Sequence, residues 1–139
     1  MTNAVFVDAS FWVVYRDTDE LRQPLAGRIL GELFQERAPL VTTLPVLCEI
    51  HAYFARRPLA RHRVLADLCD NPIVTLEDIS QKDKNAALEI LRKNRDKTYS
   101  LCDALSFVVM RRLNVRRAAS FDRHFRQFGE FQVIPDQFP

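Results

Sequence analysis

The sequence contains little glycine and few cysteines, and both shortages exclude classes of site. Three glycines in 139 residues are too few for a glycine-rich phosphate loop, and no P-loop, GxGxxG or GxSxG pattern is present. Cys48, Cys69 and Cys102 show no CxxC or Cys/His ligand spacing, which argues against a disulfide framework or a structural zinc site. This cysteine usage indicates a reducing compartment, and we predict a cytoplasmic protein.

Long apolar runs are also missing. No stretch approaches the roughly 18 apolar residues of a membrane span, and the N-terminal MTNAVFVDAS has no basic region that would begin a secretory signal. With 47% hydrophobic and 27% charged residues, the composition excludes the disordered and low-complexity classes. The length fits one domain, so residues 1–139 are expected to form a single domain without a membrane partner.

Short apolar segments alternate with helical patterns along the chain. Such an alternation indicates a mainly parallel sheet that is covered by helices on both faces. The predicted fold class is therefore α/β, a three-layer α/β/α arrangement with a mainly parallel sheet of four to five strands. The predicted strands are 4–7, 39–42, 73–76, 118–121 and 131–134, and the main predicted helices are 24–37, 44–55, one from 58, one after Ser80, and 100–113.

Four of the 18 acidic residues stand out because three lie in otherwise apolar segments and the fourth ends an apolar strand. Asp8 is the only charged residue in 1–15, Glu49 the only one in 40–54, and Asp103 the only one in 99–110. Asp122 ends the strand-like segment AASFD. The carboxyl ends of parallel strands and the starts of the following helices share one edge of a sheet, so the four carboxylates can converge there.

Each of these acids also has a plain structural interpretation. Asp8 could begin a turn, and Glu49 could be the exposed position of an amphipathic helix. Asp103 follows Ser100 by three residues, which is the spacing of a capping box, and Asp122 could cap a short helix. Other acids lie in polar segments, as in the loop around 17–20 and the helix start around 77–83.

Four carboxylates in one apolar site need a cation, because like charges drive one another's pKa upward. Oxygen ligands favour Mg²⁺ or Mn²⁺, whereas His51, His62 and His124 are not spaced as a zinc ligand set. An acidic metal site without a nucleotide loop indicates hydrolysis of a phosphodiester, in which the ion polarises the phosphoryl oxygen and stabilises the leaving oxygen.

Basic residues are mostly arginine, with 16 Arg against 4 Lys, and many are clustered. The guanidinium fork suits phosphate groups, so the clusters are candidates for contact with a nucleic-acid backbone. Arg56, Arg57 and Arg123 are the RNA-binding candidates. The alternative is that these clusters are solvated helix faces.

Four segments in the same order carry a resemblance to a known family. They are FVDASFW, TTLPVLCEI with Glu49, DKTYSLCDALSF with Asp103, and AASFDRHF with Asp122. On these segments the chain resembles the PIN-domain ribonucleases, and within them the VapC-type toxins of toxin–antitoxin pairs. The resemblance implies a PIN-like fold over 1–139 and RNA cleavage that depends on Mg²⁺ or Mn²⁺. It also implies a homodimer and a VapB-like antitoxin partner.

The resemblance implies a role for each matching acid. Asp8 and Asp103 would be the primary metal ligands, and Glu49 and Asp122 would complete the site, partly through waters. All four would then be catalytic residues.

Three serines match supporting positions of the family. Ser10 could orient a ligand or phosphate, or could be a helix N-cap. Ser100 precedes the third acid and has helix capping as its other role. Ser120 could bond a water at the metal, or could be an ordinary strand serine. Cys102 stands where the family commonly has a small hydroxyl residue, and packing is its expected role.

Two other functions remain open at this point. A PIN-fold RNA-processing nuclease without an antitoxin would use the same acids, and the neighbouring gene would distinguish it. A non-catalytic RNA- or partner-binding module on this fold would bind RNA without cleaving it and without a metal.

Overall fold

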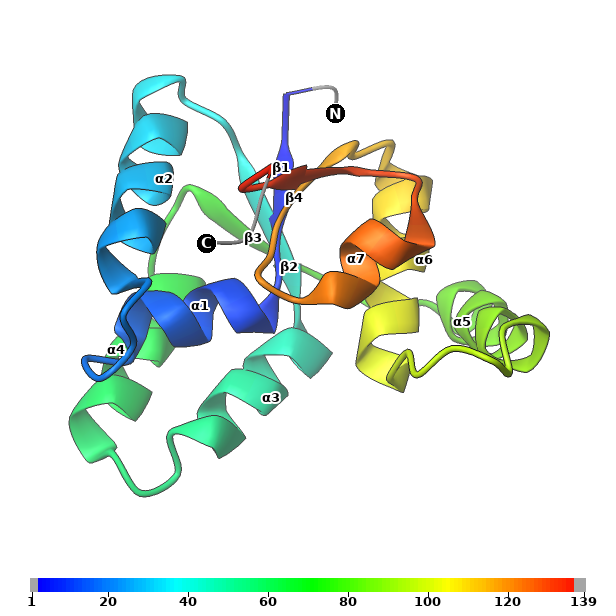
Figure 1. Ribbon diagram of the computed structural model, residues 1–139, viewed down its shortest axis with the longest axis horizontal. Coiled ribbons are helices and arrows are strands. Elements are labelled where there is room, and N and C mark those ends of the chain that lie inside the picture. Colours follow the sequence, from blue (N-terminus) through cyan, green and yellow to red (C-terminus); the bar gives the residue numbers. More distant parts are fainter. Residues whose placement is uncertain (1–2, 137–139) are drawn as a thin grey trace.

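Five short apolar segments form one sheet, in which every pair of neighbouring strands is parallel. The computed structural model describes residues 3–136, and Figure 1 shows the sheet at the centre of the molecule. The strand order is β3-β2-β1-β4-β5, which confirms the predicted α/β class. The strands are β1 (Val5–Val7), β2 (Leu40–Thr43), β3 (Val74–Glu77), β4 (Arg117–Ala119) and β5 (Gln132–Ile134).

Helices cover both faces of this sheet. Figure 1 shows α1, α2 and α4 on one side of the strands and α6 and α7 on the other, while α5 packs against α6. None of the helices within residues 3–136 combines the length and apolarity that crossing a bilayer requires. The helices are α1 (Ala9–Arg16), α2 (Gln23–Gln35), α3 (Leu44–Tyr53), α4 (Pro58–Cys69), α5 (Gln81–Lys93), α6 (Leu101–Leu113) and α7 (Arg123–Phe128).

Helix α1 differs from the sequence prediction, which places no helix over 9–16. Its apolar run FWVV is rich in aromatic and β-branched residues, which favour strands, and it has no clear helical period. The helix begins because the Asp8 carboxylate caps it, accepting a hydrogen bond from the backbone N–H of Ser10. Phe11 and Trp12 are fully buried in the core.

The order of the strands creates a crevice beside β1. The chain proceeds from β1 through β2 to β3 in one direction and then crosses back to β4 and β5 on the other side of β1. Right-handed crossovers place the helices of these two halves on opposite faces. The helices after β1 and β4, α1 and α7, therefore lie on opposite sides of the sheet (Figure 1), and open parallel sheets bind their ligands at such a switch point. Asp8 follows β1 here, and its backbone N–H donates to the carbonyl of Ala119 at 3.0 Å.

Asp17 is buried, although its segment is polar in sequence. Its carboxylate accepts hydrogen bonds from the Arg57 guanidinium at 2.7 Å and from the Tyr53 hydroxyl at 3.0 Å. Burial alone would raise the pKa of Asp17, but these bonds and the backbone N–H of Asp19 outweigh it, so the pKa falls below its ordinary value. Asp17 is therefore a structural carboxylate with its own cation.

Asp83 is a second buried acid in a segment that looks polar in sequence. It completes a capping box with Ser80 at the start of α5 and accepts a hydrogen bond from the Arg112 guanidinium at 3.0 Å. Burial opposes ionisation, but the backbone N–H of Ser80 and the charge of Arg112 outweigh it and lower the pKa of Asp83. Arg112 also pairs with Glu77 at 3.1 Å, which ties α6 to the end of β3.

Replacement of Arg112 tests this structural pairing. Arg112→Met leaves the Asp83 carboxylate buried without its cation, so the free energy of unfolding should fall by roughly 1–3 kcal/mol. Urea denaturation followed by circular dichroism measures the change. Arg63→Met is the control, since Arg63 is exposed, and it should change stability by less than about 0.5 kcal/mol. Equal effects of both substitutions would contradict the pairing.

Candidate metal centre

The four acids singled out in the sequence line a single pocket of about 710 Å³. They come from four places in the chain, namely the end of β1, the middle of α3, the first turn of α6 and the start of α7. The structure therefore brings together side chains that are up to 114 residues apart, from Asp8 to Asp122. Ser10, Ser100 and His124 line the same pocket.

Asp8 is the most deeply buried of these acids and is held by two serines. Its Oδ2 accepts hydrogen bonds from the hydroxyls of Ser10 at 2.8 Å and Ser120 at 3.1 Å. Burial raises the pKa of Asp8 to about 7, and the charges of Asp103 and Asp122 add to the rise, while the Ser10 hydrogen bond opposes it. The serines thus fix this carboxylate but do not compensate for its burial.

The same two serines connect the loops after β1 and β4. The Ser10 hydroxyl accepts from the backbone N–H of Phe121 at 2.9 Å, and the Ser120 hydroxyl accepts from the backbone N–H of Asp122 at 3.0 Å. Asp8, and not Ser10, is the N-cap of α1, so the alternative role considered for Ser10 is wrong. Ser120 lies just beyond β4 and is fully buried.

Asp103 is held by the first turn of α6. Its carboxylate accepts from the backbone N–H of Ser100 at 3.0 Å, and its own N–H donates to the Ser100 hydroxyl at 2.9 Å. Burial raises the pKa of Asp103, and the nearby charge of Asp122 adds to this, against the opposing effects of Ser100 and His124. The capping box expected from the sequence is present, and it aims the carboxylate into the pocket.

Glu49 and Asp122 are the more accessible acids. Asp122 caps α7, where it accepts from the backbone N–H of His124 at 2.9 Å. Glu49 lies on α3, and partial burial of its carboxyl group raises its pKa, with further contributions from the charges of Asp103 and Asp122. Cys102 packs against the core, and its thiol opposes the rise in the pKa of Glu49.

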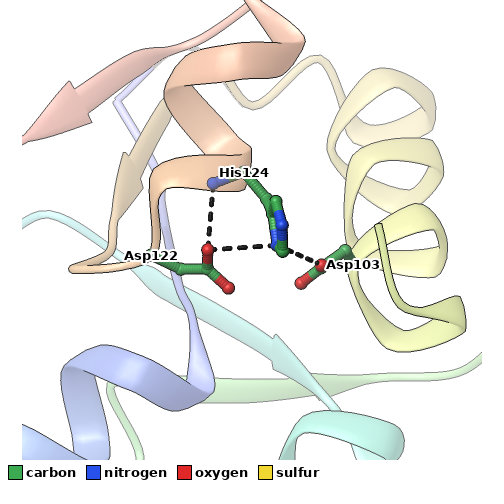
Figure 2. A group of neighbouring side chains, drawn as sticks. All are labelled: Asp103, Asp122 and His124. Carbon is green, nitrogen blue, oxygen red and sulfur yellow. Dashed lines mark hydrogen bonds and ion pairs between the residues drawn. The ribbon is translucent and has the colours of Figure 1, made fainter. Parts of the chain in front are cut away.

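His124 also belongs to this site, which the sequence analysis does not predict. Its Nδ1 lies 2.9 Å from Oδ2 of Asp103 and 3.1 Å from Oδ1 of Asp122, as Figure 2 shows. One ligand atom from each of the three residues lies within 4.8 Å of the others. A zinc-type spacing among the histidines is absent from the sequence. The signal that could have found His124 is its position two residues after Asp122 at a helix start.

The predicted RNA-binding arginines lie outside the pocket lining. Arg56 and Arg123 are exposed, while the Arg57 guanidinium is bonded to Asp17 and lies 3.7 Å from Asp19. Other clustered arginines also have acidic partners, since Arg111 pairs with Glu130 and Arg117 pairs with Glu36. Part of the arginine excess is therefore paired with acids of the chain itself, and the RNA contacts remain a prediction.

Comparison with known proteins identifies the family of this site. The sequence profile of the PIN domain matches residues 5–130. The chain belongs to the PIN domain family. It is 31% identical over 134 residues to the 23S rRNA-specific endonuclease VapC20 from two strains of Mycobacterium tuberculosis, a match that covers 95% of this chain and 99% of each relative.

A solved structure agrees with this assignment. The crystal structure of Mycobacterium tuberculosis VapC20, described as a Sarcin-Ricin loop cleaving toxin, superposes with a TM-score of 0.82 at 28% identity. The match covers 94% of this chain and 98% of the other. The predicted membership of the PIN-domain ribonucleases of VapC type is confirmed, and with it the prediction of a ribonuclease toxin.

The raised pKa of Asp8 predicts how the stability of the metal-free protein changes with pH. Between about pH 4 and pH 7 the folded protein keeps a proton on Asp8 that the unfolded chain has lost, so stability without metal falls as pH rises through this range. Asp8→Asn removes the buried charge and should stabilise the metal-free protein at pH 8, by at most about 4 kcal/mol, with the gain vanishing near pH 4. Denaturation in EDTA at both pH values measures the effect.

Asp17→Asn is the matched control, because Asp17 is equally buried but ion-paired. Its pKa is lowered in the folded protein, so its stabilising contribution is present above about pH 4 and is lost below that pH. Asp17→Asn should therefore destabilise the protein at pH 8. Destabilisation by Asp8→Asn at pH 8 would contradict the assignment of Asp8 as an uncompensated carboxylate.

Proposed function

We propose that this chain is a Mg²⁺- or Mn²⁺-dependent endoribonuclease, the toxin of a toxin–antitoxin pair, and that its substrate is a folded loop of ribosomal RNA. The substrate class rests on the likeness to VapC20, which is named as a 23S rRNA-specific endonuclease. The observation that carries the metal dependence is the pocket at the end of β1, where four acids meet. No arginine or lysine within residues 3–136 forms an ion pair with any of them.

The donor set fits a divalent ion. Asp17 and Asp83 show that buried acids elsewhere in this chain are paired with arginine and have lowered pKa values. Asp8 and Asp103 lack such a cation and have raised pKa values. Carboxylate oxygens are the ligands that Mg²⁺ and Mn²⁺ accept, so a divalent ion supplies the missing positive charge.

Each acid has a role in this proposal. Asp8 and Asp103 bind the ion directly, and Glu49 and Asp122 complete the metal site, partly through waters. When bound, the ion polarises the scissile phosphate and favours ionisation of the attacking water. Glu49 is the most exposed of the four, and its carboxylate can accept the proton that water loses in the pocket.

The serines hold the acids of the pocket in place. Ser10 and Ser120 hold Oδ2 of Asp8, and Ser100 holds Oδ2 of Asp103. These bonds keep the carboxylates in place against their mutual repulsion, so that no rearrangement is needed when substrate arrives. Ser10 and Ser100 also line the pocket, where a phosphate oxygen can reach them.

The other sequence predictions extend this proposal. We propose that residues 1–139 form one PIN domain that acts as a cytoplasmic homodimer and is inhibited by a VapB-like antitoxin. Arg56 and Arg123 are exposed and available for the RNA backbone. Arg57 can also contact the RNA backbone while it remains paired with Asp17, because nearly half of its side chain, 47%, is exposed.

Cleavage of a defined RNA tests the proposal. The purified chain should cleave a sarcin-ricin loop oligonucleotide at one position in Mg²⁺ or Mn²⁺, and EDTA should abolish the product. Asp8→Asn and Asp103→Asn should each slow cleavage at least about 100-fold, since loss of a ligand removes several kcal/mol of transition-state stabilisation. The mapped RNA ends give the cleavage position.

Glu32→Gln is the control for the cleavage assay, because Glu32 is exposed on α2 and lies outside the pocket. It should cleave at the wild-type rate. Full activity of Asp8→Asn or Asp103→Asn, prepared free of wild-type protein, would contradict the proposed chemistry. Cleavage of other RNAs but not of the loop would contradict only the substrate.

Thermal stability reports metal binding without RNA. Millimolar Mn²⁺ or Mg²⁺ should raise the melting temperature of the wild type, because a ligand present at 100 times its Kd stabilises the folded state by about 2.7 kcal/mol. Asp103→Asn should show a much smaller shift, since its amide still accepts the Ser100 hydrogen bond but no longer carries the charge. Equal shifts in both proteins would place the ion elsewhere.

A further inference from the structure

The imidazole of His124 introduces a nitrogen donor into a site that is otherwise built from oxygen. Its Nδ1 faces the carboxylates of Asp103 and Asp122 at 2.9 and 3.1 Å (Figure 2). This nitrogen is shielded from solvent, yet it makes no hydrogen bond within residues 3–136 despite these short distances. The ring is thus aimed between two acids without the alignment of a hydrogen bond to either.

Contacts on the other side of the ring fix its direction. Nε2 lies 2.9 Å from the Thr98 hydroxyl, and the ring packs edge-on against Tyr99 with centroids 5.6 Å apart. The backbone N–H of His124 donates a hydrogen bond to Oδ1 of Asp122. Histidines that bind metals through one nitrogen commonly bond the other to a hydrogen-bond acceptor, which fixes the tautomer. In the tautomer with its proton on Nε2, His124 donates to the Thr98 hydroxyl and keeps the lone pair on Nδ1 for an ion.

The charge around this pair of acids agrees with a metal ligand. Elsewhere in the described chain the buried acids Asp17 and Asp83 are matched by arginines, whereas the base that touches Asp103 and Asp122 is an imidazole. A guanidinium could only pair with these acids. A neutral imidazole has a lone pair, so it can coordinate a cation that binds between the ring and these two carboxylates.

We propose that Nδ1 of His124 is a metal ligand, which shares one ion position with Asp103 and Asp122. The nitrogen donor makes that position favour Mn²⁺ over Mg²⁺, because imidazole suits transition-metal ions whereas Mg²⁺ prefers an all-oxygen shell. This inference rests on the proposed metal-dependent function and adds to it the identity of a ligand and the preferred ion.

Pulsed electron paramagnetic resonance of the full chain loaded with Mn²⁺ tests the inference directly. A coordinated imidazole should give nitrogen-14 modulation on the Mn²⁺ signal, and His124→Phe and His124→Asn should abolish it. Calorimetric titration should show Mn²⁺ binding weakened about tenfold or more in His124→Phe, with a smaller change for Mg²⁺. His124→Asn offers an amide oxygen in place of Nδ1, so it should narrow the preference for Mn²⁺ over Mg²⁺.

His62→Asn is the control, because the sequence has only three histidines and the other two, His51 and His62, line a separate pocket. It should keep both the modulation and the Mn²⁺ affinity. Bound Mn²⁺ without nitrogen modulation, or no bound Mn²⁺, would overturn the inference. If the wild type still cleaves RNA in Mg²⁺ and Asp103→Asn does not, the proposed function stands even when the inference about His124 fails. Nitrogen modulation without RNA cleavage would support the His124 ligand and contradict the proposed function.

Discussion

Burial of carboxylates without a matching cation is the constraint on which this structure depends. The chain buries two kinds of acid, and its own arginines distinguish them. Asp17 and Asp83 face Arg57 and Arg112, so their pKa values lie below the ordinary range. Asp8 and other acids of the pocket have no arginine or lysine against them within residues 3–136, and the pKa of Asp8 rises to about 7. An arrangement that costs stability in the free protein is typical of a site built for a ligand.

The topology of the sheet explains why these acids meet at β1. Strand order reverses between β1 and β4, so the helices after these strands, α1 and α7, lie on opposite sides of the sheet and leave room for a pocket (Figure 1). Ser10 and Ser120 then connect the loops after β1 and β4 through Asp8, Phe121 and the following backbone. The hydrogen bonds that join these two loops therefore also orient Asp8, and the capping box at the start of α6 orients Asp103.

Most of this arrangement could be predicted from the sequence, because it depends on local patterns. Short apolar segments predict the strands, and isolated acids such as Asp8 and Asp103 predict the pocket. What escaped prediction depends on contacts between distant residues. Helix α1 forms from strand-like residues because its face is buried, and the polar segment around Asp17 is covered by an arginine 40 residues away. His124 joins the site only through the fold, since the helix cap at Asp122 turns its ring toward α6.

Anomalous diffraction from a crystal grown with Mn²⁺ tests the central claim most directly. If the uncompensated acids exist to hold a divalent ion, the strongest anomalous peak will lie in the pocket at the carboxyl ends of β1 and β4, within bonding distance of Asp8 or Asp103. The absence of a peak from this pocket, in a crystal where Mn²⁺ occupies other positions, would contradict the account. The raised pKa values would then reflect burial and repulsion among the acids, without a role in metal binding.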